Sequence, residues 1–188
     1  MNRLFNIHII IYFFLFYSLI ISSSFPQSLQ DRIHLGIKLF PTIVGGNLDL
    51  KSQCDSNGYI TLLVVYSTNQ IAANKAFDTL QHSVDKIYHY PIHIYITNDL
   101  NFSNYQDKAV SGIFISEKLP AYLIKKVVRF GVQNKVIVFS PFIDDVEAGV
   151  TAGLFISTQI KPALNINTIN KSHIHINQLF YKVAKVYP

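Results

Sequence analysis

The chain alternates short runs of β-branched and aliphatic residues with longer amphipathic segments, and this alternation constrains the fold more than any other feature. The first run, residues 59–66, reads YITLLVVY and is apolar at nearly every position. A run of this length between turn residues is typical of a strand that is buried on both faces of a sheet. Further apolar runs predict strands at residues 92–97, 110–116 and 135–139. The polar residues 98–108, between the first two of these runs, predict a loop.

Most of the segments between these runs have the 3.6-residue spacing of helices. One apolar face begins near Ser28 and continues to Pro41 and the following Gly45-Gly46 pair, where we expect that helix to end. Two more helices are predicted over residues 69–87 and 117–133. Strands and helices that alternate in this way predict an α/β domain of three layers, in which a mainly parallel central sheet lies between helices.

The last third of the chain has a different pattern. Residues 153–157 and 161–167 flank a short polar turn, which predicts an antiparallel hairpin. A short turn or helix follows, and apolar residues at helical spacing predict a closing helix over residues 176–187. Because no linker or internal repeat divides the sequence, we expect a single domain over residues 25–188.

The beginning of the chain matches the three parts of a secretory signal peptide. Arg3 is the only charged residue among the first 30, and an apolar stretch follows at residues 9–21. Small side chains at Ser22 and Ser24 suit cleavage after Ser24, so we predict a signal peptide over residues 1–24. The apolar stretch is shorter than the roughly 20 residues of a membrane span, but an uncleaved anchor is the alternative. We therefore expect an exported protein that contacts the membrane only through its leader.

Composition excludes several classes of protein and of site. Hydrophobic residues make up 49% of the chain and charged residues 14%, which excludes intrinsic disorder. The net charge of +5 is modest and does not favour a nucleic-acid partner for an exported chain. A single cysteine, Cys54, excludes an internal disulfide framework and a multi-thiolate zinc site. His173 and His175 have a metal-ligand spacing, and His89 and His93 are further candidates, but no set of three or four ligands converges in the sequence. We expect no metal and no cofactor.

Hydroxyl and acidic residues follow three of the predicted strands. The carboxyl ends of parallel strands meet at one edge of a sheet, where open α/β sheets bind their ligands. Helix capping and compensation of the helix dipole are the alternative explanation for the same residues, and the one that we favour. The sequence has no GxGxxG, GxxxxGK or GxSxG motif, so we expect a protein that is not an enzyme. The candidate ligand- or partner-binding residues are Ser67, Ser116, Glu117, Ser140, Phe142, Asp144, Asp145 and Glu147.

Four segments in the second half of the chain carry a resemblance to a known family. Residues 110–116 form a small apolar strand that ends in Ile-Ser, and residues 136–140 precede an acidic loop and a pair of glycines, Gly149 and Gly153. Residues 161–167 close on Ile-Asn and lead into the terminal pattern QLFYKVAKV. In these features the chain resembles the YfiR-like family of small bacterial periplasmic regulatory proteins.

The resemblance implies a function outside the inner membrane. Proteins of this family bind the periplasmic part of a membrane sensor, such as a diguanylate cyclase, and restrain its output. The chain has only Cys54, so the redox response that cysteine pairs give to characterised members should be absent. We expect a non-enzymatic regulator with an exposed apolar patch, to which Phe40, Phe142 and Ile143 are candidate contributors. The alternative is a single-lobe periplasmic protein that binds a small molecule for an uptake system.

Overall fold

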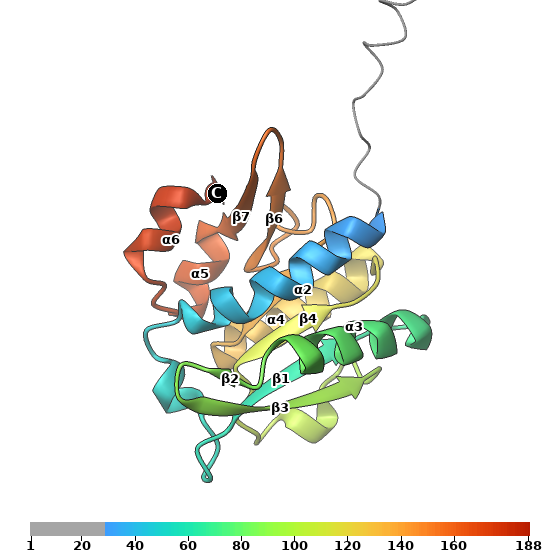
Figure 1. Cartoon of the computed structure of the whole chain (residues 1–188), viewed down its shortest axis with the longest axis vertical. Coiled ribbons are helices and arrows are strands. Elements are labelled where there is room, and N and C mark those ends of the chain that lie inside the picture. The colour runs from blue at the N-terminus through green and yellow to red at the C-terminus, as the bar shows by residue number, and fades with distance from the viewer. Residues whose placement is uncertain (1–28) are drawn as a thin grey trace, which may run out of the picture.

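The computed structural model describes residues 29–188, and the predicted signal peptide at residues 1–24 lies outside the described residues. Among residues 29–188, none of the helices has both the length and the apolar character that a membrane span needs. The elements are coloured along the chain in Figure 1.

The first described helix, α2 (Leu29–Gly45), continues past Pro41 to the Gly45-Gly46 pair, the second of the two features at which we expected it to end. Pro41 lies inside the helix and cannot donate a backbone hydrogen bond to the preceding turn. Apolar residues on both sides of the proline, Phe40 and Ile43 among them, are fully buried against the sheet, and this burial offsets the missing bond. The helix ends at the predicted glycine pair, where the backbone N–H of Gly46 donates to Thr42 and Ile43.

The central sheet has eight strands in the order β2-β3-β1-β4-β5-β6-β7-β8. Neighbouring strands are parallel except at two places, the pair β2–β3 and the hairpin β6–β7. This arrangement confirms the predicted α/β domain with a mainly parallel sheet and a C-terminal antiparallel hairpin. The strands are β1 (Ile60–Val65), β2 (Lys86–Ile87), β3 (Tyr90–Thr97), β4 (Gly112–Ile115), β5 (Ile137–Ser140), β6 (Ala152–Ile156), β7 (Ile160–Asn165) and β8 (Lys185–Tyr187).

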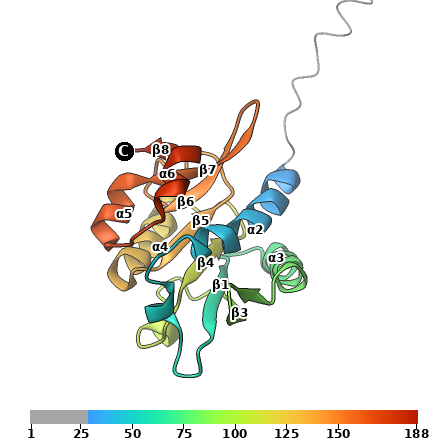
Figure 2. The same ribbon diagram turned by 60° about the vertical axis from the view of Figure 1, so that its left-hand side comes forward.

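Helices cover the two faces of the sheet and complete the three layers. On one face, α2 and α3 (Gln70–Ser83) pack over the sheet, and on the other lies α4 (Ala121–Asn134). Figure 2 shows α3 and α4 on opposite sides of the strands. Alternate residues of β1 enter the two cores, because Leu62 faces α2 and α3 whereas Leu63 faces the side of α4. The short helix α5 (Ile166–Ser172) lies beside α4 and β7.

The end of the chain differs from the predicted closing helix. Instead of one helix over residues 176–187, the chain forms the short helix α6 (Gln178–Val183) and then β8, which pairs in parallel with β7. Ala184 already has extended backbone angles. Sequence periodicity could not show this change, because it depends on an open strand edge at β7, to which the last residues add. Likewise, the helix predicted to reach residue 87 ends at Ser83, and the following residues pair with β3.

Two 3-10 turns, η1 (Leu50–Gln53) and η2 (Ser103–Tyr105), complete the elements found within residues 29–188. The connection between β3 and β4 contains η2 but no α-helix, which agrees with the predicted polar loop.

Candidate functional site

Glu117 joins the ends of two neighbouring strands at the carboxyl edge of the sheet. It follows β4, and its carboxylate accepts hydrogen bonds from the backbone N–H groups of Ser67, Thr68 and Asn69, which follow β1 and lead into α3. The hydroxyl of Thr68 donates to Oε2 at 3.2 Å. Partial burial acts to raise the pKa of Glu117, but the hydrogen bonds from Thr68, Ser67 and Asn69 outweigh it and lower the pKa below its ordinary value.

Ser116, the residue before it, joins the same two strands from inside the sheet. Its side chain is buried, and its hydroxyl donates to the backbone carbonyl of Val65 at 2.9 Å. The strand ends therefore bring Ser67, Ser116 and Glu117 together, as predicted, but the Glu117 carboxylate is bonded to the backbone N–H of Ser67, and the Ser116 hydroxyl is bonded to the Val65 carbonyl. Their geometry is that of structural capping, which the sequence offered as the alternative explanation.

Asp145 is the central polar group of the loop after β5. The residue is 2% exposed, and its two carboxylate oxygens accept from Lys118 Nζ and Ser140 Oγ, each at 2.5 Å. Lys118 also donates to the carbonyl oxygen of Ile143 at 2.7 Å. Lys118 was not among the predicted residues, although its position directly after Glu117 placed it at the same strand end. The ion pair fixes the acidic loop against the end of β4.

The other predicted residues of the acidic loop differ in exposure. Asp144 and Glu147 are exposed, whereas Phe142 is only 5% exposed. Phe40 is fully buried on the face of α2 that packs against the sheet, so neither it nor Phe142 contributes to an exposed apolar patch, contrary to our expectation. Ile143 is 61% exposed and does contribute apolar surface. Aromatic residues of these two segments supply the core because α2 and the loop both pack onto the sheet.

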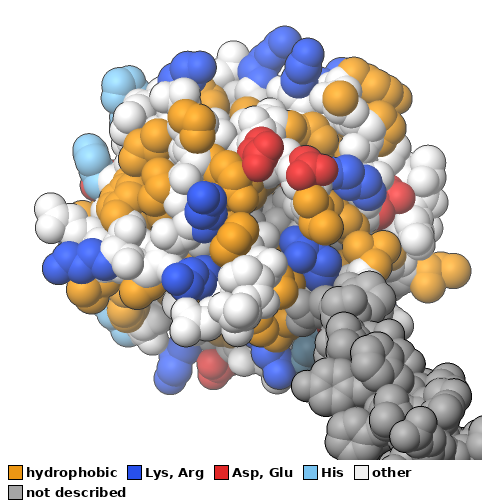
Figure 3. Space-filling model, turned by 90° about the horizontal axis from the view of Figure 1, so that it is seen from above, with side chains coloured by type: hydrophobic (Ala, Val, Ile, Leu, Met, Phe, Trp, Pro, Cys, Tyr) orange, Lys and Arg blue, Asp and Glu red, His pale blue; other side chains and the backbone are white. Residues whose placement is uncertain are grey.

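A cavity of about 180 Å³ opens beside this loop, where β5 ends and the hairpin begins to project. It brings together three of the predicted residues with others from α2, the hairpin and the last strand. Its lining residues are Arg32, Phe142, Ile143, Asp144, Val146, Glu147, Leu154, Phe155, Ile156, Ala163 and Tyr187. Figure 3 views the molecule from the end at which α2 begins and the hairpin projects, and it shows a few acidic side chains among basic and hydrophobic ones.

Arg32 is the buried charge of this cavity, and sequence analysis missed it. The residue is 9% exposed, and its guanidinium donates from Nε to the carbonyl of Pro141 at 3.0 Å and from Nη2 to the carbonyl of Leu154 at 3.3 Å. Burial lowers the pKa of Arg32, and the nearby Asp144 carboxylate opposes this effect. The only sequence signal was an arginine next to the apolar residue Ile33 in the first turns of a helix that is otherwise apolar on one face.

The guanidinium retains capacity for a ligand. Neither of the two ion pairs formed within residues 29–188 involves Arg32, so no carboxylate of this part of the chain lies in ion-pair contact with it. The Nη1 atom of Arg32 has no hydrogen-bond partner within residues 29–188, and it is not one of the polar atoms that are fully shielded from solvent. A guanidinium binds carboxylates through paired N–H groups, so the site suits an anionic group.

The histidines considered as metal ligands lie elsewhere. In the described part of the chain, no three His, Cys, Asp or Glu side chains are grouped as metal ligands. His175 Nδ1 instead lies 2.6 Å from a carboxylate oxygen of Asp49, and His93 stacks on the ring of Tyr59. The thiol of Cys54 contacts the carbonyl of Leu50 at 3.7 Å, and burial raises its pKa.

Comparison with known proteins shows the fold of this chain. No family model and no curated protein matches the sequence. The ABC domain in complex with L-Trp from Streptococcus pneumonia has a similar structure, with a TM-score of 0.54 and 10% identity over 81% of this chain and 62% of the other. A substrate binding protein with adhesive properties from Clostridium difficile, in a ligand-free, open structure, has a TM-score of 0.53 and 14% identity over 85% of this chain and 59% of the other. This chain thus spans about three fifths of the length of each, and at these identities the likeness establishes a shared α/β fold.

Proposed function

We propose that this protein is an exported, single-lobe binding protein that holds a small molecule with both a carboxylate and an ammonium group, of the amino-acid type. The ligand occupies the cavity between Arg32 and the acidic loop after β5. The observation that carries the proposal is the buried guanidinium of Arg32, which lines the cavity and has no carboxylate partner among the described residues. A ligand carboxylate would complete its hydrogen bonds and compensate its buried charge.

The negative charges at the cavity support the assignment of an ammonium group to the ligand. Asp144 and Glu147 both line the cavity, and both are exposed carboxylates. A ligand ammonium placed beside them would interact favourably while the ligand carboxylate contacts Arg32. The volume of about 180 Å³ is below the roughly 300 Å³ at which cavities for drug-sized ligands begin, so it suits a smaller molecule.

The structural comparisons and the predicted leader support the same function. One of the two similar structures holds L-Trp, and the other is named a substrate binding protein. Such proteins generally work outside the cytoplasm, which agrees with the signal peptide predicted over residues 1–24. A binding role also agrees with the expected absence of enzymatic activity, which remains part of the proposal.

The test is a calorimetric titration with three matched small ligands: L-alanine, lactate, which lacks the ammonium, and alaninamide, which lacks the carboxylate. Larger L-amino acids extend the set. We expect amino acids to bind best, and Arg32→Gln to weaken that binding more than about tenfold, because the ligand carboxylate loses its paired donors. The exposed Arg129 gives the matched control Arg129→Gln, which should bind as the unaltered protein does.

A second variant keeps the test valid if Arg32→Gln folds poorly. Asp144 has a backbone φ of 69°, a conformation that asparagine also adopts readily, so Asp144→Asn should preserve the loop. In this variant the preference for alanine over lactate should shrink, because the ammonium loses a carboxylate. Failure of every amino acid to bind the folded protein, or unchanged binding in a folded Arg32→Gln variant, would overturn the proposal.

A YfiR-like regulatory role is the second candidate, and one observation favours it. Leu179, Val183 and Val186, on the C-terminal elements α6 and β8, are each at least 40% exposed. Lys182 and Lys185 lie among them in the sequence. This apolar and basic surface suits an acidic segment of a membrane sensor. A sensor with an extracytoplasmic segment encoded beside this gene would favour regulation, whereas a neighbouring permease would favour ligand uptake.

A further inference from the structure

Part of the sheet face on the side of α4 is open, because the connection from β3 to β4 holds only η2. Successive side chains of β3 point to opposite faces of the sheet. Ile92, Ile94 and Ile96 pack into the core beneath α2 and α3. His93 and Tyr95 point to the opposite face, where both are exposed, Tyr95 by 46%. A large aromatic side chain on an uncovered sheet face is a feature that core packing does not explain.

Aromatic rings gather on this open face. Tyr59 stacks on His93 with ring centroids 4.0 Å apart and an interplanar angle of 11°. Tyr95 meets the same histidine edge-on at 6.2 Å. The half-buried Tyr105 comes from η2 and lies under Lys108, whose Nζ is 5.2 Å from the ring centroid. The open face therefore presents aromatic surface beside a cationic donor.

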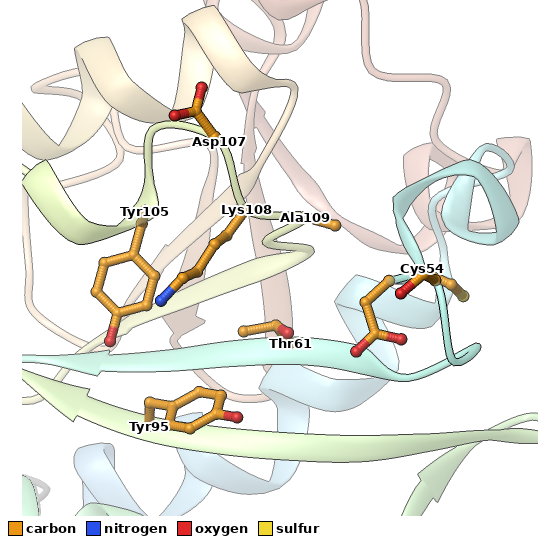
Figure 4. A pocket seen from close by; sticks show the side chains of 9 residues that line it. Cys54, Thr61, Tyr95, Tyr105, Asp107, Lys108 and Ala109 are labelled. Carbon is orange, nitrogen blue, oxygen red and sulfur yellow. The ribbon is translucent and has the colours of Figure 1, made fainter.

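A cavity of about 500 Å³ lies between this face and the loop, within the range of small-molecule sites. Figure 4 shows Tyr105 and Lys108 extending from the loop toward β1, with Thr61 on that strand and Tyr95 on the next one. The Thr61 residue is only 8% exposed, yet its hydroxyl oxygen is not among the enclosed unpartnered atoms of residues 29–188, so it is accessible from the cavity that it lines. A hydroxyl in this position can donate to and accept from a ligand's polar group.

We propose that this cavity is a second binding site and that it takes a neutral, polyhydroxylated ring, as in a saccharide. The aromatic rings of Tyr95 and Tyr105 would pack against the apolar C–H face of the sugar ring. The hydroxyl of Thr61 and the ammonium of Lys108 would bind its hydroxyl groups. This site lies at the amino end of β1, so it is independent of the site proposed beside Arg32.

The charges of the cavity favour a neutral ligand over an anionic one. Lys108 supplies one positive charge and Asp107 one negative charge. Asp55 is a second carboxylate, but its Oδ1 already accepts from the backbone N–H groups of Asn57 and Tyr59, at 2.9 and 2.8 Å. These three side chains sum to a charge of −1, which disfavours an anionic ligand, and hydrogen bonding and ring packing are the interactions through which a neutral ring gains affinity.

The test is an NMR titration of the isotope-labelled protein with glucose, galactose, N-acetylglucosamine and their β1,4-linked disaccharides. Indole and phenylalanine serve as flat aromatic comparators. We expect saturable shifts at Thr61, Tyr95 and Lys108 with at least one sugar. Tyr95→Ala should weaken that sugar about tenfold through loss of ring packing. Tyr122 on α4 is 64% exposed, so Tyr122→Ala is the matched control and should leave sugar binding unchanged.

The two proposed sites are distinguished by their variants. Arg32→Gln should leave sugar shifts at Thr61 unchanged, and Tyr95→Ala should leave amino-acid binding unchanged. The second-site proposal is overturned if no sugar gives saturable shifts, if only the aromatic comparators bind there, or if sugar binding persists unaltered in Tyr95→Ala.

Discussion

At the scale of single residues, most polar groups at the carboxyl edge of the sheet stabilise the fold. Glu117 binds the backbone that leads into α3, and Asp145 is held by Lys118 and Ser140. Arg32 differs from them, because backbone carbonyls alone satisfy it within the described chain. Only the polar groups that retain free bonding capacity are strong candidates for ligand recognition.

Glu117→Gln should lower stability by about 1–2 kcal/mol at neutral pH, because an amide accepts hydrogen bonds from backbone N–H groups less strongly than a carboxylate. The folded-state pKa of Glu117 lies below its usual value of 4.5, so the extra stability is fully present above that value. It is lost as the pH falls through the folded-state pKa, because both states then bind the proton. Urea unfolding between neutral and acidic pH should show the two proteins converging below pH 4.5.

The exposed Glu147 supplies the control for this measurement. Glu147→Gln should change the free energy of unfolding by less than about 0.5 kcal/mol at any of these pH values. A constant difference between Glu117→Gln and the unaltered protein across the acidic range would contradict the assigned role of the carboxylate.

At the scale of elements, the contact between α2 and β4 depends on a residue without a side chain. A Cβ atom added to Gly112 would lie 2.7 Å from Cγ2 of Val44 and 2.8 Å from Cζ of Phe40. These distances are too short for van der Waals contact, so glycine permits the helix to approach the sheet this closely. The position of α2 also determines where Arg32 enters the cavity.

Gly112→Ala should therefore destabilise the protein by about 1–3 kcal/mol through overpacking. Adding Phe40→Leu in the same chain should restore part of that loss, because the smaller side chain makes room for the new methyl group. Thermal and urea unfolding of the two single variants and the double variant measure the coupling directly. Strictly additive effects would show that the two residues do not compete for the same space.

Sequence patterns predicted the elements whose burial can be inferred from the order of apolar residues within the element itself. The run at residues 59–66 predicted β1 because a strand covered on both faces is apolar throughout. The same patterns could not predict β8, which exists only because β7 offers a free edge. They also missed Arg32, since its buried position depends on hydrogen bonds to the carbonyls of Pro141 and Leu154, which are more than 100 positions away in the chain.

At the scale of the whole molecule, one sheet supports both hydrophobic cores. Leu62 and Leu63 are adjacent and fully buried, yet they belong to cores on opposite faces of β1. Neither core can lose its packing without disturbing the strand that it shares with the other. Such sharing favours a single cooperative unfolding transition.

Leu62→Ala and Leu63→Ala should each lower the free energy of unfolding by about 2–5 kcal/mol, through lost burial and the cavity left behind. Each variant should shift the same transition, and far-ultraviolet and near-ultraviolet circular dichroism should report one midpoint. Two separate midpoints in either variant would mean that the two cores unfold independently.

The carboxylate of Glu117 has a consequence for selectivity at the scale of the whole lobe. It occupies the N–H groups at the start of α3, the position where nucleotide phosphates commonly attach in sheets with this strand order. A phosphate at this position would have to displace the Glu117 carboxylate, which is also negatively charged and is attached to the end of β4. This arrangement disfavours a nucleotide phosphate at α3, and the recognition of a ligand carboxylate that we propose takes place farther along the sheet edge, in the cavity that Arg32 lines.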